Sequence, residues 1–104
     1  MIFDWDEQKE KQNVKNHDGV NFDEASAAVQ DDFALEEYDD AHSTADEKRY
    51  NCIGVGGNKF LYVVYTVRNE ETISEFCRII LARLAEPQER ESYEREKFNS
   101  GYFG

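Results

Sequence analysis

The sequence predicts an α+β fold with two N-terminal helices, an antiparallel sheet of about four strands and a C-terminal helix. Residues 60–68 and 76–83 are dense in β-branched and aromatic side chains and are separated by a polar break, which favours an antiparallel pair of strands. Helix-capping patterns occur twice within the first 30 residues. Pro87 begins a last segment with helical spacing of opposite charges, which predicts a helix to about residue 98.

Two helices are expected before the sheet, after a short strand at residues 2–3. Asp6 is an N-cap residue type for a helix over 7–17. Asn21 begins a second helix over 22–30, where a glutamate at the third helical position completes a capping-box pattern. The apolar stripe of this second helix predicts that it packs on the sheet. The stripe consists of Phe22, Ala25 and Val29.

The sheet is expected to begin as a meander. Residues 33–38 form a weak strand, a polar loop follows over 39–46, and 48–55 form a better strand. The segment 56–58, Gly-Gly-Asn, is the clearest hairpin signal in the chain. Alternation along 60–68 leaves both faces of the strand partly apolar, which predicts a central strand. We expect helices to cover one face of the sheet. Part of the other face is then open to another use, such as ligand binding.

Length and charge limit the possible classes of function. A chain of 104 residues gives one domain, which we place at 1–98, followed by a frayed tail at 99–104. The formal net charge of -11 opposes attraction to nucleic acid or to anionic membranes, so we expect no direct DNA binding. Residues 1–50 hold 15 acidic and 5 basic side chains, whereas 51–104 hold 8 and 7. Local phosphate binding therefore stays possible in the second half.

The sequence lacks signals for a membrane or a cofactor. No apolar run approaches the roughly 20 residues of a membrane span, and the N-terminus does not have the pattern of a signal peptide, so a cytoplasmic protein is expected. Cys52 and Cys77 lie inside predicted strands, without metal-ligand spacing to each other or to His17 and His42. We expect buried, reduced thiols, and neither a metal nor another cofactor.

Three arginines stand near the ends of the two best strands, namely Arg68, Arg78 and Arg83. In a chain this acidic they can pair with carboxylates, or they can bind phosphate, because guanidinium groups match phosphate oxygens bidentately. Arg78 and Arg83 are five positions apart, so in an unbroken strand they point to opposite faces. A bulge, or the end of the strand, would change this.

Several segments in order, from Phe3 to Tyr93, share a pattern with a known family. They are Phe3-Asp4-Trp5-Asp6-Glu7, residues 16–25, Asp40-Ala41-His42-Ser43, residues 49–54, residues 63–68, and residues 78–83 with Glu89 and Tyr93 downstream. Together they resemble the BrnT toxin family. The resemblance implies a fold similar to the RelE toxins and a ribonuclease of a type II toxin–antitoxin pair. It also implies a BrnA antitoxin partner that carries a ribbon-helix-helix DNA-binding region.

Metal-independent RNA cleavage needs a deprotonated 2′-OH, charge stabilisation at phosphorus and a proton for the leaving oxygen. With the resemblance, we assign Arg68 and Arg83 to phosphate binding and transition-state charge. His42 is the candidate general acid or base, because imidazoles exchange protons near neutral pH, although a loop histidine is often an ordinary surface residue. Second-rank candidates, for RNA binding or for orienting His42, are Arg78, Arg49, Glu47 and Tyr93. Tyr65 is expected in the core by its position in the strand.

Two other classes of function fit the same residues. A toxin-fold protein without catalytic activity would persist as the binding partner of a DNA-binding antitoxin. Alternatively, an acidic run would act as an interaction module that docks a basic partner, although a plain solvated acidic face has the same composition. The run consists of Glu36, Glu37, Asp39, Asp40, Asp46 and Glu47.

Overall fold

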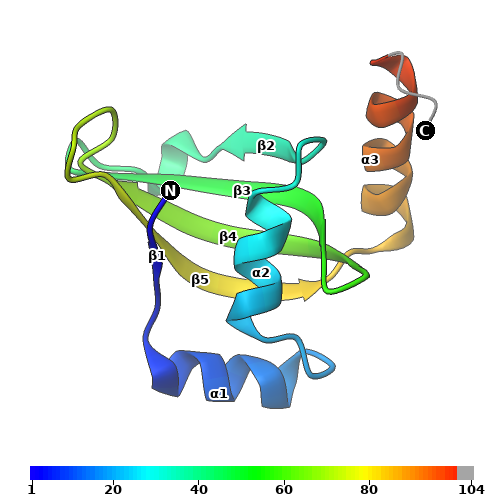
Figure 1. Cartoon of the computed structure of the whole chain (residues 1–104), viewed down its shortest axis with the longest axis horizontal. Helices are drawn as coiled ribbons and strands as arrows, with labels where there is room; N and C mark the ends of the chain where they lie inside the picture. Colours follow the sequence, from blue (N-terminus) through cyan, green and yellow to red (C-terminus); the bar gives the residue numbers. More distant parts are fainter. Residues whose placement is uncertain (101–104) are drawn as a thin grey trace.

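The computed structural model describes residues 1–100 and contains a five-stranded sheet in the order β1-β5-β4-β3-β2 (Figure 1). The strands are β1 (Phe3–Asp4), β2 (Leu35–Tyr38), β3 (Glu47–Gly56), β4 (Lys59–Arg68) and β5 (Phe76–Leu84). The helices are α1 (Glu7–Asn16), α2 (Phe22–Val29) and α3 (Pro87–Asn99), with a short 3-10 helix η1 (Asp40–His42). The predicted α+β class is confirmed. The sheet gains a strand over the expected number because β1 joins β5, in the one parallel pairing among these strands.

The helix and turn signals explain how the elements begin and end. The Asp6 carboxylate accepts the backbone N–H groups of Gln8 and Lys9 at the start of α1, and a reciprocal capping box begins α2. Gly57 and Asn58 both have positive φ, 61° and 62°, as a two-residue hairpin turn requires. In the expected tail, residue 99 ends α3 and residue 100 is its C-cap, while residues 101–104 lie outside the described part.

The core lies between the sheet and the helices α1 and α2. One face of the sheet is therefore buried. On β4 the buried residues of this face are Leu61, Val63, Tyr65 and Val67. Helix α2 approaches β3 so closely that a Cβ at Gly54 would lie 2.2 Å from the carbonyl oxygen of Ala28. Only glycine fits there. Both cysteines, Cys52 and Cys77, are buried free thiols in the core, as expected.

A bulge in β5 decides which way its arginines point. Ile80 is an extra residue in the pairing with β4. As a result Arg78 pairs with Thr66 and Arg83 pairs with Tyr62, and these partners lie on the same face of β4. The strand is therefore not unbroken, and the alternative of a bulge, which the sequence left open, places the two arginines on the same face.

The sheet has a second face, opposite the core, and helix α3 covers one end of it. The rings of Phe60 and Tyr93 meet edge to face at 5.6 Å, and the guanidinium of Arg90 lies 4.1 Å from the Phe60 ring. We call the rest of this face the open face. On the three central strands its side chains come from Glu47, Arg49, Asn51, Val64, Thr66, Arg68, Phe76, Arg78, Leu81 and Arg83. Within residues 1–100, no helix has the length and apolar character needed to cross a membrane.

Candidate functional site

Four arginines lie on the open face, and three of them lie close together. Arg49 on β3 and Arg78 on β5 stand directly opposite Thr66 on β4, so three neighbouring strands present an arginine, a threonine and an arginine side by side. We call these three residues the Thr66 row. Arg68 lies two positions along β4, on the same face. Arg83 lies opposite Tyr62, about 13 Å along the strand from the Thr66 row at roughly 3.3 Å per residue. The structure thus brings together three arginines and leaves Arg83 apart.

Each of these arginines is paired with a carboxylate. The pairs are Arg49 Nε with Asp39 (3.9 Å), Arg68 Nε with Glu47 (2.8 Å), Arg78 Nη2 with Asp4 (3.1 Å) and Arg83 with Glu89 through two bonds of 2.8 and 2.9 Å. The charge of the open face is therefore largely neutralised within the protein. Arg68 and Arg78 belong to the more exposed pairs, and such pairs are worth only about 0–1 kcal/mol each, so an incoming phosphate can compete for their guanidinium groups.

His42 is connected to this group of arginines through Asp39. The Asp39 carboxylate lies 2.8 Å from His42 Nδ1, and its same oxygen is 3.9 Å from Arg49 Nε. Asp39 also caps η1 by accepting the backbone N–H of His42. The hydroxyl of Ser43 fixes the turn, since it donates to the Asp39 carbonyl oxygen and accepts the Arg49 N–H. His42 itself is 66% exposed and accessible to a ligand.

Asp39, and not Glu47, is therefore the carboxylate that orients His42. Glu47 was expected in that role but holds Arg68, because the two residues stand opposite each other on β3 and β4. An aspartate three positions before a histidine in a polar loop is a helix-cap pattern, which is the signal in the sequence that identifies Asp39.

Arg83 lies where the open face meets the part of the sheet that α3 covers, and Tyr93 lies on α3 itself. The Arg83 guanidinium lies 4.1 Å from the centre of the Tyr62 ring and joins β5 to α3 through Glu89. Hydrogen bonding to Arg83 lowers the pKa of Glu89 below its ordinary value of 4.5, against the opposing effect of burial. Tyr93 is 3% exposed and its hydroxyl donates to the Asp31 carboxylate at 2.6 Å. Tyr93 is thus a packed residue and is not presented to the open face.

Thr66 is a residue of the open face that the sequence did not single out. It is 3% exposed, and its Oγ1 is the one buried side-chain oxygen or nitrogen, within residues 1–100, that has no hydrogen-bond partner. A β-branched residue inside a strand is the ordinary choice for a strand position. Nothing in the sequence pattern therefore distinguishes it from its neighbours, and only the pairing register reveals the arginines on both sides.

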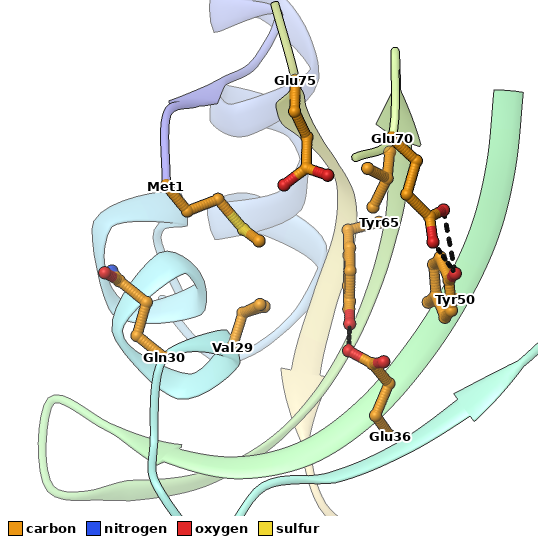
Figure 2. Close-up of a pocket in the computed structure, with 9 residues that line it drawn as sticks. Met1, Val29, Gln30, Glu36, Tyr50, Tyr65, Glu70 and Glu75 are labelled. Atoms are coloured by element: carbon orange, nitrogen blue, oxygen red, sulfur yellow. Dashed lines mark hydrogen bonds between the residues drawn. The ribbon is translucent and has the colours of Figure 1, made fainter. Parts of the chain in front are cut away.

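A cavity lies on the opposite, helix-covered side of the sheet, and Figure 2 shows its acidic side chains. It measures about 400 Å³. The Tyr65 hydroxyl donates to Glu36 there, and the Tyr50 hydroxyl donates to both oxygens of Glu70 (Figure 2). Burial first, and then Glu70, raises the pKa of Tyr50 to about 12. Its lining contains three carboxylates, including that of Glu75, and no lysine or arginine side chain.

The fold and the open face define a class of small α+β proteins that present arginines on one side of an antiparallel sheet, an arrangement suited to phosphate groups. The chain belongs to the BrnT family, since the model of that family, described as a ribonuclease toxin, BrnT, of a type II toxin–antitoxin system, matches residues 5–89. The resemblance found in the sequence is thereby confirmed. The match includes the Thr66 row, His42 and Arg83.

Membership of this family implies an antitoxin as the partner of the chain. No curated protein sequence matches it.

Proposed function

We propose that this chain is a metal-independent endoribonuclease toxin of the cytoplasm, which binds RNA on its open face and is neutralised by a BrnA-like antitoxin with a ribbon-helix-helix region. The observation that carries the proposal is the connection of Arg49, through Asp39, to the imidazole of His42. One network thus contains a group that binds phosphate and a group that transfers protons. Membership of a ribonuclease toxin family supports the same conclusion.

The chemistry follows from the positions of these groups. An RNA phosphodiester draws the guanidinium groups of Arg49, Arg68 and Arg78 from their carboxylates and is held between them. His42, oriented by Asp39, takes the proton of the ribose 2′-OH, whose oxygen attacks the neighbouring phosphorus. The arginines stabilise the negative charge that develops there. The leaving 5′ oxygen takes up a proton from water, and the protonated His42 returns its proton to the solvent, so the products end in a 2′,3′-cyclic phosphate and a 5′-hydroxyl.

Arg83 contributes to the same function as a second contact for RNA. It lies along β4 from the Thr66 row, at a distance that fits a neighbouring phosphate better than the one that reacts. Its pairing with Glu89 means that it also supports the position of α3. Loss of Arg83 is therefore expected to affect both binding and stability.

A second candidate function is favoured by the neutralised charge of the open face. Because all four arginines already have carboxylate partners, a protein that has lost catalysis and only binds its antitoxin is compatible with the same geometry. Expression in a bacterial host, with and without the neighbouring reading frame, separates the two functions. Growth arrest that the neighbour relieves, and that His42→Gln abolishes, supports the nuclease. Normal growth in every case supports the inactive partner.

A further inference from the structure

Thr66 lies near the centre of the open face with a hydroxyl that no group in the described part of the chain engages. A buried hydroxyl normally has a partner, because folding removes it from the water that would otherwise bond to it. Each exception calls for an explanation, and a ligand that supplies the missing partner is one. The surroundings of Thr66 identify what kind of ligand that is.

The residues directly opposite Thr66 on both neighbouring strands are arginines. Arg49 and Arg78 occupy these positions, where Cβ atoms lie about 4.5–5.5 Å apart across the sheet. Neither guanidinium bonds to Thr66. Arg49 is drawn to Asp39 in the turn before η1, and Arg78 to Asp4 on the edge strand β1. The two guanidinium groups that lie across from the Thr66 hydroxyl are thus bound by carboxylates and not by Thr66.

Both arginines can turn toward Thr66 at small cost. Their side chains are 35% and 47% exposed, and exposed ion pairs contribute little to stability. A phosphodiester offers each guanidinium a charge-assisted bond in place of the carboxylate. An anion that is bound between the two arginines then lies over Thr66, whose hydroxyl becomes a third donor to it.

We propose that Arg49, Thr66 and Arg78 form the subsite for the scissile phosphodiester of RNA, in which Thr66 Oγ1 donates a hydrogen bond to a non-bridging oxygen. This inference rests on the proposed function, since it takes RNA as the substrate. The hydroxyl transfers no proton in the reaction. It holds the phosphorus in place while the 2′ oxygen attacks.

Thr66→Val tests the subsite, because valine keeps the shape of threonine and lacks only the hydroxyl. The probe is a short RNA with 2′-O-methyl groups, which has no free 2′-OH and stays uncleaved. Affinity for it is expected to fall at least about tenfold, the effect of a hydrogen bond to a charged group. The melting temperature is expected to stay unchanged or to rise, because the hydroxyl has no partner in the free protein.

Two further variants serve as controls. Thr66→Ser keeps a hydroxyl at the same position and is expected to retain most of the affinity. Thr72→Val removes a hydroxyl that donates to the Asn69 carbonyl oxygen in the loop between β4 and β5, outside the open face. Its affinity for the methylated RNA is expected to equal that of the parent protein.

The outcomes separate the subsite from the proposed function. Unchanged affinity of Thr66→Val overturns the subsite even if the parent protein cleaves RNA. A fall in affinity together with a lower melting temperature shows a structural role instead and also overturns it. If the parent protein binds the methylated RNA through Thr66 but cleaves no unmodified RNA, the subsite stands and the nuclease function fails. If the parent protein does not bind the probe, the subsite is wrong, and cleavage of unmodified RNA decides separately whether the nuclease function stands.

Discussion

At the scale of single residues, Glu47 and Arg68 show how the proposed RNA-binding face is compatible with an acidic protein. The Arg68 guanidinium is bound by Glu47, yet both side chains are at least one third exposed. Solvent screens such a pair, so the phosphate of RNA can replace the carboxylate at little cost. The carboxylates around the open face therefore weaken binding without preventing it.

Replacing Glu47 with glutamine is expected to raise the affinity for RNA several-fold. The amide keeps the size of the side chain but removes the charge that competes for Arg68. Titration of the methylated RNA at two salt concentrations measures the effect, with Glu91→Gln on the exposed side of α3 as the matched control. Weaker binding by Glu47→Gln would show that Arg68 takes no part in the interface.

His42→Gln is expected to lower the rate of RNA cleavage by about 10² or more, as for loss of a general acid or base. It should also remove the limb near neutral pH from the pH–rate profile. His17→Gln, at the C-terminus of α1 and far along the chain from this network, is the matched control. A profile that keeps its shape in His42→Gln would show that His42 is an ordinary surface residue.

The sequence could identify His42 and the arginines as candidates. It could not identify Asp39 and Thr66, which lie beside them in the structure. Asp39 belonged to a long acidic run, in which no member stands out until η1 places one carboxylate beside the imidazole. Thr66 carried no signal, because its importance depends on which residues face it across two strands. Contacts of this kind depend on register, which a single sequence specifies only weakly.

At the scale of elements, α3 is attached to the sheet by polar contacts at its start and by aromatic packing further along. Glu89 in its first turn holds Arg83 of β5, and the Tyr93 ring packs on Phe60 of β4. The Tyr93 hydroxyl bonds Asp31, whose pKa is raised by burial but lowered further by hydrogen bonds, so that it lies below its ordinary value. The position of α3 thus depends on two ionised carboxylates.

Arg83→Ala is expected to lower the free energy of unfolding by about 1–3 kcal/mol, because it leaves the partly buried Glu89 carboxylate without its partner. It should also weaken RNA binding. Thermal unfolding and titration with the methylated RNA measure the two effects. Arg95→Ala, further along α3 in an exposed pair, is the control and should change neither. Full stability in Arg83→Ala would show that the contact with Glu89 does not hold α3.

The free energy of unfolding should decrease at acidic pH, because Glu89 becomes protonated there and loses its interaction with Arg83. Its pKa is depressed in the folded state, so its contribution is complete above the unfolded value near 4.5 and is lost as the pH falls through the lower folded value. Glu89→Gln should therefore flatten the dependence of melting temperature on pH below about 4.5. Curves for the variant and the parent that run parallel there would contradict the assignment.

The elements themselves were largely predictable, whereas the pairing between β4 and β5 was not. Capping residues such as Asp6 and Asn21, and the turn at Gly57, act locally and can be recognised from their type. The bulge at Ile80 has no such signal, since an isoleucine fits any strand position. It nevertheless decides that Arg78 and Arg83 share a face.

At the scale of the whole molecule, the net charge of -11 leads us to expect that DNA binding comes from the antitoxin and not from this chain. Affinity for the DNA backbone rises with the number of cationic contacts, and here each contact works against a repulsive field. We therefore expect the antitoxin to cover the open face and to supply DNA binding. We expect the acidic cavity lined by Glu36, Glu70 and Glu75 to add to the negative potential that would attract a basic antitoxin.

A mobility-shift assay on the promoter of the operon tests this division. The isolated protein is expected to give no shift, and the complex with its antitoxin is expected to give one that weakens as salt increases. Antitoxin alone serves as the control. A tight, sequence-specific shift by the isolated protein would show that its own surface binds DNA despite the charge.

Cleavage of RNA by the purified protein in excess EDTA tests the proposed nuclease most directly. The expected products carry 2′,3′-cyclic phosphate and 5′-hydroxyl ends, and their formation should be lost in the double variant Arg49→Ala/Arg78→Ala, while Arg95→Ala cleaves like the parent protein. Cleavage that requires a divalent metal, or products with 3′-hydroxyl ends, would contradict the mechanism. Undiminished cleavage by the double variant would show that the reaction takes place elsewhere on the molecule.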